Sequence, residues 1–144
     1  MALGTLASLL ETEEGRRFFN AYLHDSNHPR PEFAKYYNFY LDTVKLTESK
    51  GSVEELLKAA NLCFENYVAI EADTRLDAIV NRSITNEVEK TLDDCREKGT
   101  NPKNTFCDLQ QKSLNYLEQN IFHPHIVPLL KEEKEKRISA CILN

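Results

Sequence analysis

The stretch SVEELLKAANLCFENYVAIEA, residues 52–72, decides the fold. Its apolar residues recur every three or four positions, which is the period of one face of an α-helix. Ser52 and Glu55 have the form of a capping box, in which each side chain accepts the other's backbone N–H group. This is the longest regular amphipathic pattern in the chain, and it predicts a helix from about Val53 to Ala72.

Helical patterns precede this stretch on its N-terminal side. Residues 5–23 carry apolar side chains at helical spacing, with a possible break near Gly15. Residues 32–47 form an unusually aromatic stripe, for which core packing is favoured over a surface that stacks on a ligand. The segment between them contains two prolines and predicts a loop.

Further helical patterns follow the stretch. Thr74 and Asp77 repeat the form of a capping box and predict a helix toward Cys95, with a plausible break at residues 81–83. The last long helix is predicted from about residue 105, and it should end near Phe122 because Pro124 follows. We therefore expect an all-α domain over residues 1–130, followed by a charged helix or tail over residues 131–144.

Length and charge exclude several classes of protein. The chain has 144 residues, about the size of one domain. Its 18 basic and 23 acidic residues give a net charge of −5, which disfavours nucleic acid as the main partner. No apolar run approaches the length of a membrane span, and the first residues do not resemble a secretory signal. We expect a cytoplasmic monomer, with recruitment to the inner face of the plasma membrane left open.

No motif in the sequence predicts an active site. The four cysteines, Cys63, Cys95, Cys107 and Cys141, lack C-x-x-C spacing, so reduced thiols are expected in place of a zinc site. His123 and His125 lack the further ligands of a metal site. Phosphate-binding glycine loops and nucleophile turns do not occur. We therefore expect no enzyme activity of its own, no cofactor, no metal and no small-molecule substrate. The last four residues have the outline of a lipidation box at Cys141, with an unusual final Asn144.

The order of these segments resembles the regulator-of-G-protein-signalling (RGS) family. In that family a G-x-x-x-F-x-x-[FY]-L helix is followed by an acid with paired aromatics, by A-x-x-[IV]-[YF]-x-x-[FY]-[IV], and by F-x-x-A-Q with [LI]-M-E-x-D-S-[YF]-x-R-F-L. The similar segments here are GRRFFNAYL (residues 15–23), EFAKYY (32–37), ANLCFENYV (60–68), FCDLQ (106–110) and LEQNIFHPHI (117–126). The resemblance covers about residues 5–128.

The resemblance implies a fold and a function. It implies about nine helices in two lobes, one built from the first and last helices and one around the helices near residues 53–72 and 75–96. It also implies binding to the α subunit of a heterotrimeric G protein, with faster GTP hydrolysis because the switch loops of the α subunit are held in their transition-state arrangement. The family adds no arginine finger.

The resemblance also implies an interface with several substitutions. Glu32 keeps the acid of the aromatic helix, whereas the Asn that follows it in the family falls on Phe33, which has no amide to donate. A second contacting Asn falls near Asp77, and the family's Asp, Ser and Arg fall on Asn120, Ile121 and Pro124. The predicted partner interface is Glu32, Phe33, Asp77, Tyr116, Asn120, Ile121 and Pro124.

Three hypotheses follow. In the first, the domain binds an α subunit and stimulates its GTPase. In the second, it is an RGS-homology domain that has lost catalysis and serves as a scaffold or docking unit inside a larger signalling or trafficking protein, where apolar Phe33 and Pro124 suit packing against a partner. In the third, the resemblance is chance and the aromatic helices only fill a core. The α subunit class is not specified by the sequence.

Overall fold

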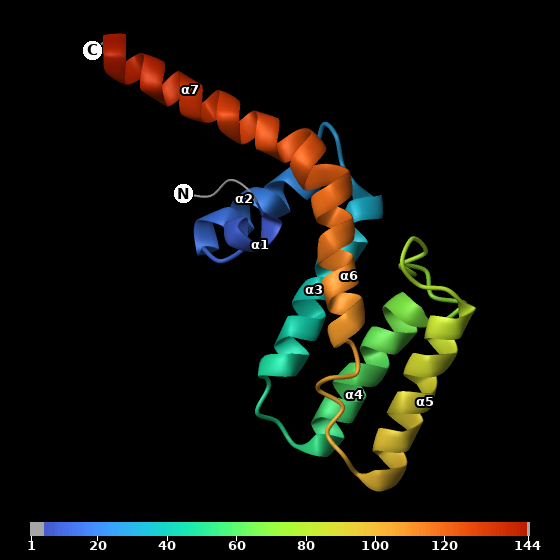
Figure 1. The fold of residues 1–144 in the computed structure, drawn as a ribbon. Helices are drawn as coiled ribbons and strands as arrows, with labels where there is room; N and C mark the ends of the chain where they lie inside the picture. The colour runs from blue at the N-terminus through green and yellow to red at the C-terminus, as the bar shows by residue number, and fades with distance from the viewer. Residues whose placement is uncertain (1–4, 144) are drawn as a thin grey trace. The chain divides into compact units, whose positions relative to one another are not determined.

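A computed structural model describes the backbone of residues 5–143 and the side chains of residues 5–136 (Figure 1). Every regular element in this part of the chain is helical, and no strand occurs in it, as expected for an all-α domain. The side chain of Cys141 lies outside the described residues. The elements are α1 (Leu6–Leu9), α2 (Glu13–Leu23), α3 (Pro31–Glu48), α4 (Val53–Cys63), η1 (Phe64–Val68), α5 (Arg82–Lys98), α6 (Cys107–Leu117), η2 (Glu118–Ile126) and α7 (Val127–Leu143).

The chain divides into two compact units. Unit 1 consists of Met1–Phe33 and Leu114–Asn144, and unit 2 consists of Ala34–Ser113. The first unit thus joins the two ends of the chain, and the second contains its middle. The resemblance to the RGS family implied a division of this kind, with one lobe from the terminal helices and one around the central ones.

The described residues form fewer separate helices than the nine that the resemblance implied, because π-helical segments extend or join some of them. Between residues 5 and 143 the structure has six continuous helical segments, because η1 prolongs α4 and η2 joins α6 to α7. The expected end near Phe122 is therefore wrong. Pro124 lies inside η2, and the Val127 N–H bonds to the Phe122 carbonyl, five residues earlier. In a π-helix the hydrogen bond reaches one residue further back, so the turn widens around a proline ring that would clash in an α-helix.

The corner between α1 and α2 depends on a glycine. A break was expected near Gly15, and the chain turns just before it, at residues 10–12, while Gly15 itself is a buried residue inside α2. A Cβ atom on Gly15 would lie 1.8 Å from the Leu9 carbonyl oxygen. Thr12 caps α2 by accepting the Gly15 N–H at 3.0 Å. Gly15 therefore permits a close approach of two backbones, which no other residue could provide.

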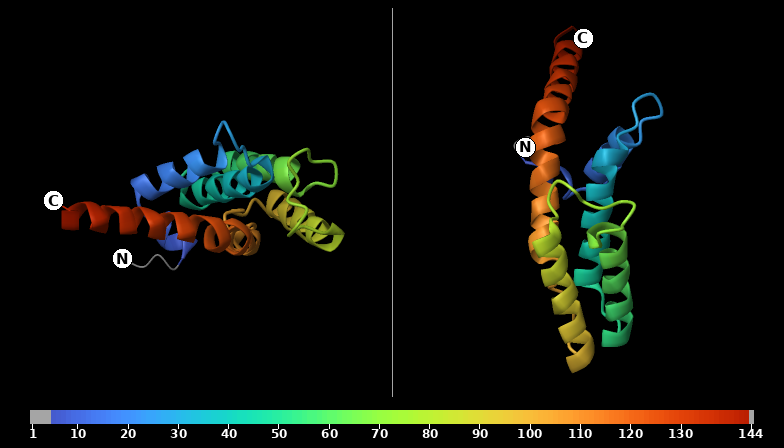
Figure 2. Two further views of the ribbon diagram at one scale, coloured as in Figure 1. Left: turned by 90° about the horizontal axis from the view of Figure 1, so that it is seen from above. Right: turned by 90° about the vertical axis from the view of Figure 1, so that its right-hand side faces the viewer.

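In unit 2, α4 and α5 lie side by side and run antiparallel (Figures 1 and 2). Ser52 caps α4 by accepting the Glu55 N–H, as the capping-box pattern predicts. Tyr36, Tyr37 and Phe39 of α3 are buried, as core packing predicts, whereas Phe33 and Tyr40 of the same helix are only half-buried. Phe39 is fully buried and meets the rings of Tyr67 and Phe106 edge-on, at centroid distances of 5.3 and 5.9 Å.

The helix predicted from Thr74 begins later than expected. Residues 69–81 form a loop, and α5 starts at Arg82 with Asn81 as its cap. The Thr74 hydroxyl donates a hydrogen bond to the Asn66 carbonyl at 2.6 Å. Leu76 is fully buried, and its N–H bonds to the Tyr67 carbonyl at 3.0 Å. The loop is thus drawn back onto the end of η1, which overrides the local capping pattern.

Candidate functional site

Six of the seven residues predicted for the interface lie in unit 1, and Asp77 lies in unit 2. Glu32 is exposed in the first turn of α3, where a negative charge is favourable at a helix N-terminus. Phe33 is half-buried, and its ring lies 6.0 Å from that of Tyr116, with the ring planes inclined by 31°. Where the family has a polar amide, this chain thus has an aromatic pair within unit 1.

Three more of these residues lie along η2. Asn120 is exposed, and its side-chain amide donates to the Tyr116 carbonyl at 2.8 Å, close to where α6 gives way to η2. Pro124 is exposed, whereas Ile121 is only 1% exposed. Ile121 is therefore a core residue of unit 1, and its side chain offers almost no surface to a partner. Glu32, Asn120 and Pro124 offer exposed surface in this unit.

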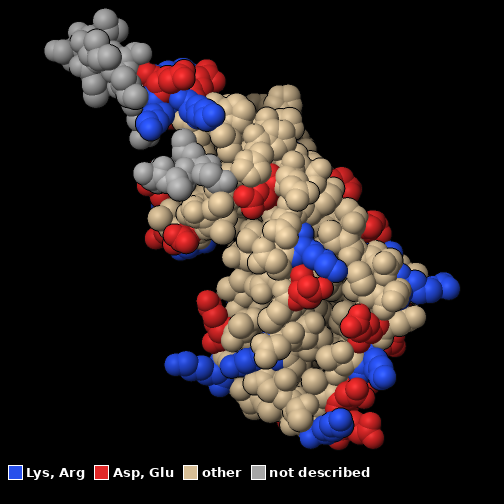
Figure 3. Space-filling model, viewed as in Figure 1, with Lys and Arg blue, Asp and Glu red and all other residues tan. Residues whose placement is uncertain are grey.

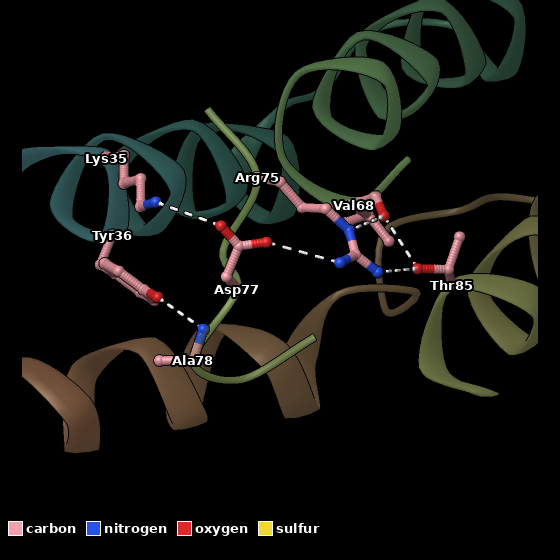
Figure 4. Close-up of polar contacts among 7 residues, drawn as sticks. All are labelled: Lys35, Tyr36, Val68, Arg75, Asp77, Ala78 and Thr85. Carbon is pink, nitrogen blue, oxygen red and sulfur yellow. Dashed lines mark hydrogen bonds and ion pairs between the residues drawn. The ribbon is translucent and has the colours of Figure 1, made fainter. Parts of the chain in front are cut away.

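Asp77 lies on the loop of residues 69–81, within a network of charges (Figure 4). Its side chain is 71% exposed, and each carboxylate oxygen faces one cation. Lys35 of α3 approaches one oxygen at 3.9 Å, and Arg75 approaches the other at 3.4 Å. The side chains of Lys35 and Arg75 are only 12% and 19% exposed. The cations therefore lie mainly inside the unit, and the carboxylate lies mainly outside it.

Arg75 also contacts the end of η1 and the start of α5 (Figure 4). Its Nε donates to the Val68 carbonyl at 3.5 Å, and its Nη2 donates to the Thr85 hydroxyl at 3.3 Å. Thr85 is buried and donates its own proton to the same Val68 carbonyl at 2.9 Å. These bonds satisfy a buried carbonyl at a helix end, which would otherwise carry a substantial desolvation cost.

A tyrosine hydroxyl fixes the residue after Asp77. Tyr36 is 2% exposed, and its hydroxyl accepts the Ala78 N–H at 2.9 Å (Figure 4). Sequence reasoning treated Tyr36 only as one of a pair of aromatics, and it assigned no role to Lys35 or Arg75. The hydroxyl that Tyr36 adds to its aromatic ring was the signal that could have been followed.

A cleft of about 370 Å³ lies between α3 and α4. Asp42 and Cys63 are among its lining residues, and Asp42 accepts the Tyr67 hydroxyl proton at 2.8 Å. Burial, with the nearby Asp42 carboxylate, raises the pKa of the Cys63 thiol to about 12. Burial and the Asp42 hydrogen bond likewise raise the pKa of Tyr67. Both groups are therefore neutral near pH 7, and the thiol is a poor nucleophile.

Outside this site, three features of the described residues bear on function: the distribution of charge, the grouping of metal-ligand residues and the hydropathy of the helices. On the face drawn in Figure 3, acidic and basic side chains are interspersed. Among the described residues no three His, Cys, Asp or Glu side chains are grouped in a way that could hold a metal ion. Within the same residues no helix is both long and apolar enough to cross a membrane.

The comparisons with known proteins identify the family. The family model for the regulator of G protein signaling domain matches residues 5–127, which is most of the chain. The chain therefore belongs to the RGS domain family, as the order of its segments indicated. A search of curated proteins and a search of solved structures gave no match. Membership of this family indicates a role in the regulation of G-protein signalling.

Proposed function

We propose that this domain binds the α subunit of a heterotrimeric G protein and accelerates its hydrolysis of GTP. The observation that carries the proposal is the family match over residues 5–127, which spans both units of the fold. The domain has no catalytic group of its own in this proposal. It acts by stabilising the arrangement of the α subunit's own water and glutamine in the transition state.

The contacts in this proposal come from exposed side chains of each unit. Glu32, Asn120 and Pro124 contribute from unit 1, and Asp77 contributes from unit 2. Glu32 and Asp77 are carboxylates that can accept hydrogen bonds from backbone N–H groups of the switch loops. Pro124 adds apolar surface where the family has an arginine.

The test is a single-turnover GTPase assay with a panel of α subunits, together with binding measured in three nucleotide states. The states are GDP, GDP with aluminium fluoride, and a non-hydrolysable GTP analogue. The fluoride complex mimics the transition state, so the proposal expects tightest binding there and faster hydrolysis with at least one α subunit. Equal binding in all states, with no acceleration across the panel, would contradict it.

A specific observation favours a second candidate function, that of a scaffold without catalytic effect. The Phe33 ring packs at a tilt against that of Tyr116 and carries no amide, so this position cannot orient a glutamine as an asparagine would. In that case Phe33→Asn should not produce stimulation, and the wild type should be silent with every α subunit. A wild-type domain that stimulates hydrolysis would rule out the scaffold function.

A further inference from the structure

We propose that Arg75 is a positioning residue, which holds the exposed carboxylate of Asp77 in place for contact with the α subunit. The inference rests on the proposed function and assigns a role to a residue that the family motifs do not mark. It is argued from the contacts of the loop of residues 69–81, all of which lie within unit 2.

The backbone of the loop is fixed on both sides of Asp77. The Leu76 N–H bonds to the Tyr67 carbonyl, and the Ala78 N–H bonds to the Tyr36 hydroxyl. The side chain of Leu76 is also fully buried, which anchors the loop at the residue before Asp77. Asp77 therefore stands on a backbone that is held by η1 on one side and by α3 on the other, so its Cα position is determined.

Packing does not determine the direction of the Asp77 side chain, because the side chain is 71% exposed. Its direction is set by charge instead. Arg75 is suited to this because its guanidinium is a rigid plane with five donors. One edge bonds to the Val68 carbonyl and the Thr85 hydroxyl, and Nη1 remains for Asp77. The arginine is thus anchored by η1 and α5 before it meets the carboxylate.

Lys35 contributes from the other side of the carboxylate. It approaches Oδ2 of Asp77, whereas Arg75 approaches Oδ1 (Figure 4). A carboxylate has about four lone-pair positions, so two such contacts leave acceptor capacity on the exposed side. The chemistry that Asp77 offers to a partner is therefore that of an oriented anionic acceptor, which suits backbone N–H groups or a basic side chain.

The energetics favour orientation over stability as the role of the pair. An ion pair with an exposed partner contributes little to folding because water and salt screen it. Asp77→Ala should therefore leave the melting temperature nearly unchanged. In contact with an α subunit the same carboxylate is desolvated, and its loss should weaken binding about tenfold.

The first part of the test uses the free domain and requires no partner. The χ1 rotamer populations of Asp77, from its Hα–Hβ couplings, and amide hydrogen exchange in the loop are measured by NMR in the wild type, in Arg75→Met and in Arg82→Met. The control, Arg82, is exposed at the start of α5. Because Arg75→Met removes the cation that faces Oδ1, Asp77 should change from one dominant χ1 rotamer to an average over several. Exchange at the Leu76 and Ala78 amides should stay slow, because their hydrogen bonds do not involve Arg75. Unchanged rotamer populations of Asp77 in Arg75→Met would overturn the positioning role.

The second part is a double-mutant cycle in binding to an α subunit loaded with GDP and aluminium fluoride. If Arg75 acts through Asp77, Arg75→Met weakens binding by less than Asp77→Ala, and the double variant binds like Asp77→Ala alone. A loss of structure would not produce this coupling. Additive effects would overturn the proposal. A wild type that binds no α subunit would overturn the proposed function and the contact role of Asp77, and the rotamer data would still decide whether Arg75 orients the Asp77 carboxylate.

Discussion

The two π-helical segments, η1 and η2, start alike and end differently. Each continues an α-helix without a capping side chain, since Cys63 and Leu117 have helical backbone angles. After η1 the chain leaves the helix at Ala69, whose ψ is 147°. After η2 the helix resumes at Val127, whose ψ is −46°. The segment that contains a proline continues, and the segment without one ends.

The difference teaches that a helix ends where its last carbonyls find other partners. At the end of η1 the Val68 carbonyl accepts bonds from Thr85 and Arg75, so the chain can leave the helix without exposing an unpaired group. Beyond η2 the Val127 N–H maintains the ladder. Proline removes one donor, and the wider π turn accommodates its ring.

The largest effect should come from the packing that holds η2. Phe122 is 1% exposed, so Phe122→Ala should lower the free energy of unfolding by about 3–5 kcal/mol, through lost burial and the cavity left behind. Chemical denaturation measures this. Gln119→Ala, an exposed change in the same segment, should alter it by less than about 0.5 kcal/mol. Similar values for both variants would mean that packing does not hold η2.

The next effect concerns the end of η1. Thr85→Val keeps the shape of the side chain but removes the donor to the buried Val68 carbonyl. This change should lower the free energy of unfolding by about 1–3 kcal/mol. Thr91 is the control, since its hydroxyl also donates to a backbone carbonyl, but to that of Glu87 in its own helix and on the exposed face of α5. Thermal unfolding of the two valine variants compares them. An equal loss in both would show that the Val68 carbonyl is not the critical group.

Replacement of the proline should have a smaller effect of opposite sign. Pro124→Ala restores an N–H inside a continuous helix but also makes the unfolded chain more flexible, which opposes the gain. We expect the free energy of unfolding to rise by about 1 kcal/mol in total. Pro29→Ala, in the loop between α2 and α3, isolates the entropy effect and should lower stability slightly. Both are measured by denaturation. A strong loss in Pro124→Ala would show that the π turn requires the proline.

The smallest effect is a pH dependence at the start of η1. Burial raises the pKa of the Cys63 thiol from 9.0 to about 12, so the thiol stays protonated in the folded state at a pH where the unfolded thiol ionises. The contribution of this thiol to the free energy of unfolding is therefore fully present below pH 9 and is lost as the pH rises toward 12. The loss is about 0.4 kcal/mol at pH 9 and grows above it. The difference in slope between wild type and Cys63→Ala measures it, and parallel curves would contradict it.

Much of the fold could be predicted because it depends on local patterns. The cap at Ser52 and the apolar period correctly predicted the start of α4, although the helical segment ends with η1 at Val68 and not near Ala72. The aromatic stripe correctly identified a core helix. The π segments could not be predicted, because their hydrogen bonds depend on packing and a proline normally predicts a helix end. The start of α5 was misplaced because Thr74 bonds back to Asn66 instead of capping.

The candidate site could be predicted only in part. Motif order placed Asp77 and Asn120 on exposed positions, but it also marked Ile121, whose burial depends on the packing of unit 1. The partners of Asp77 are Lys35 of α3 and Arg75 of the loop itself. Arg75 in turn bonds to Thr85 of α5, and no sequence spacing brings these three residues together. Whether the predicted contacts meet an α subunit stays a prediction.

The π geometry of η2 has a consequence for tolerance of insertions and deletions. A π turn closes its hydrogen bond over one more residue than an α turn, so the face that α7 presents depends on the residue count between Leu117 and Val127. A helical wheel drawn straight through α6 and α7 would assign the wrong residues to the buried side. Deletion of one residue within η2 could be absorbed by tightening to an α turn, whereas the same deletion within α5 would rotate its entire apolar stripe.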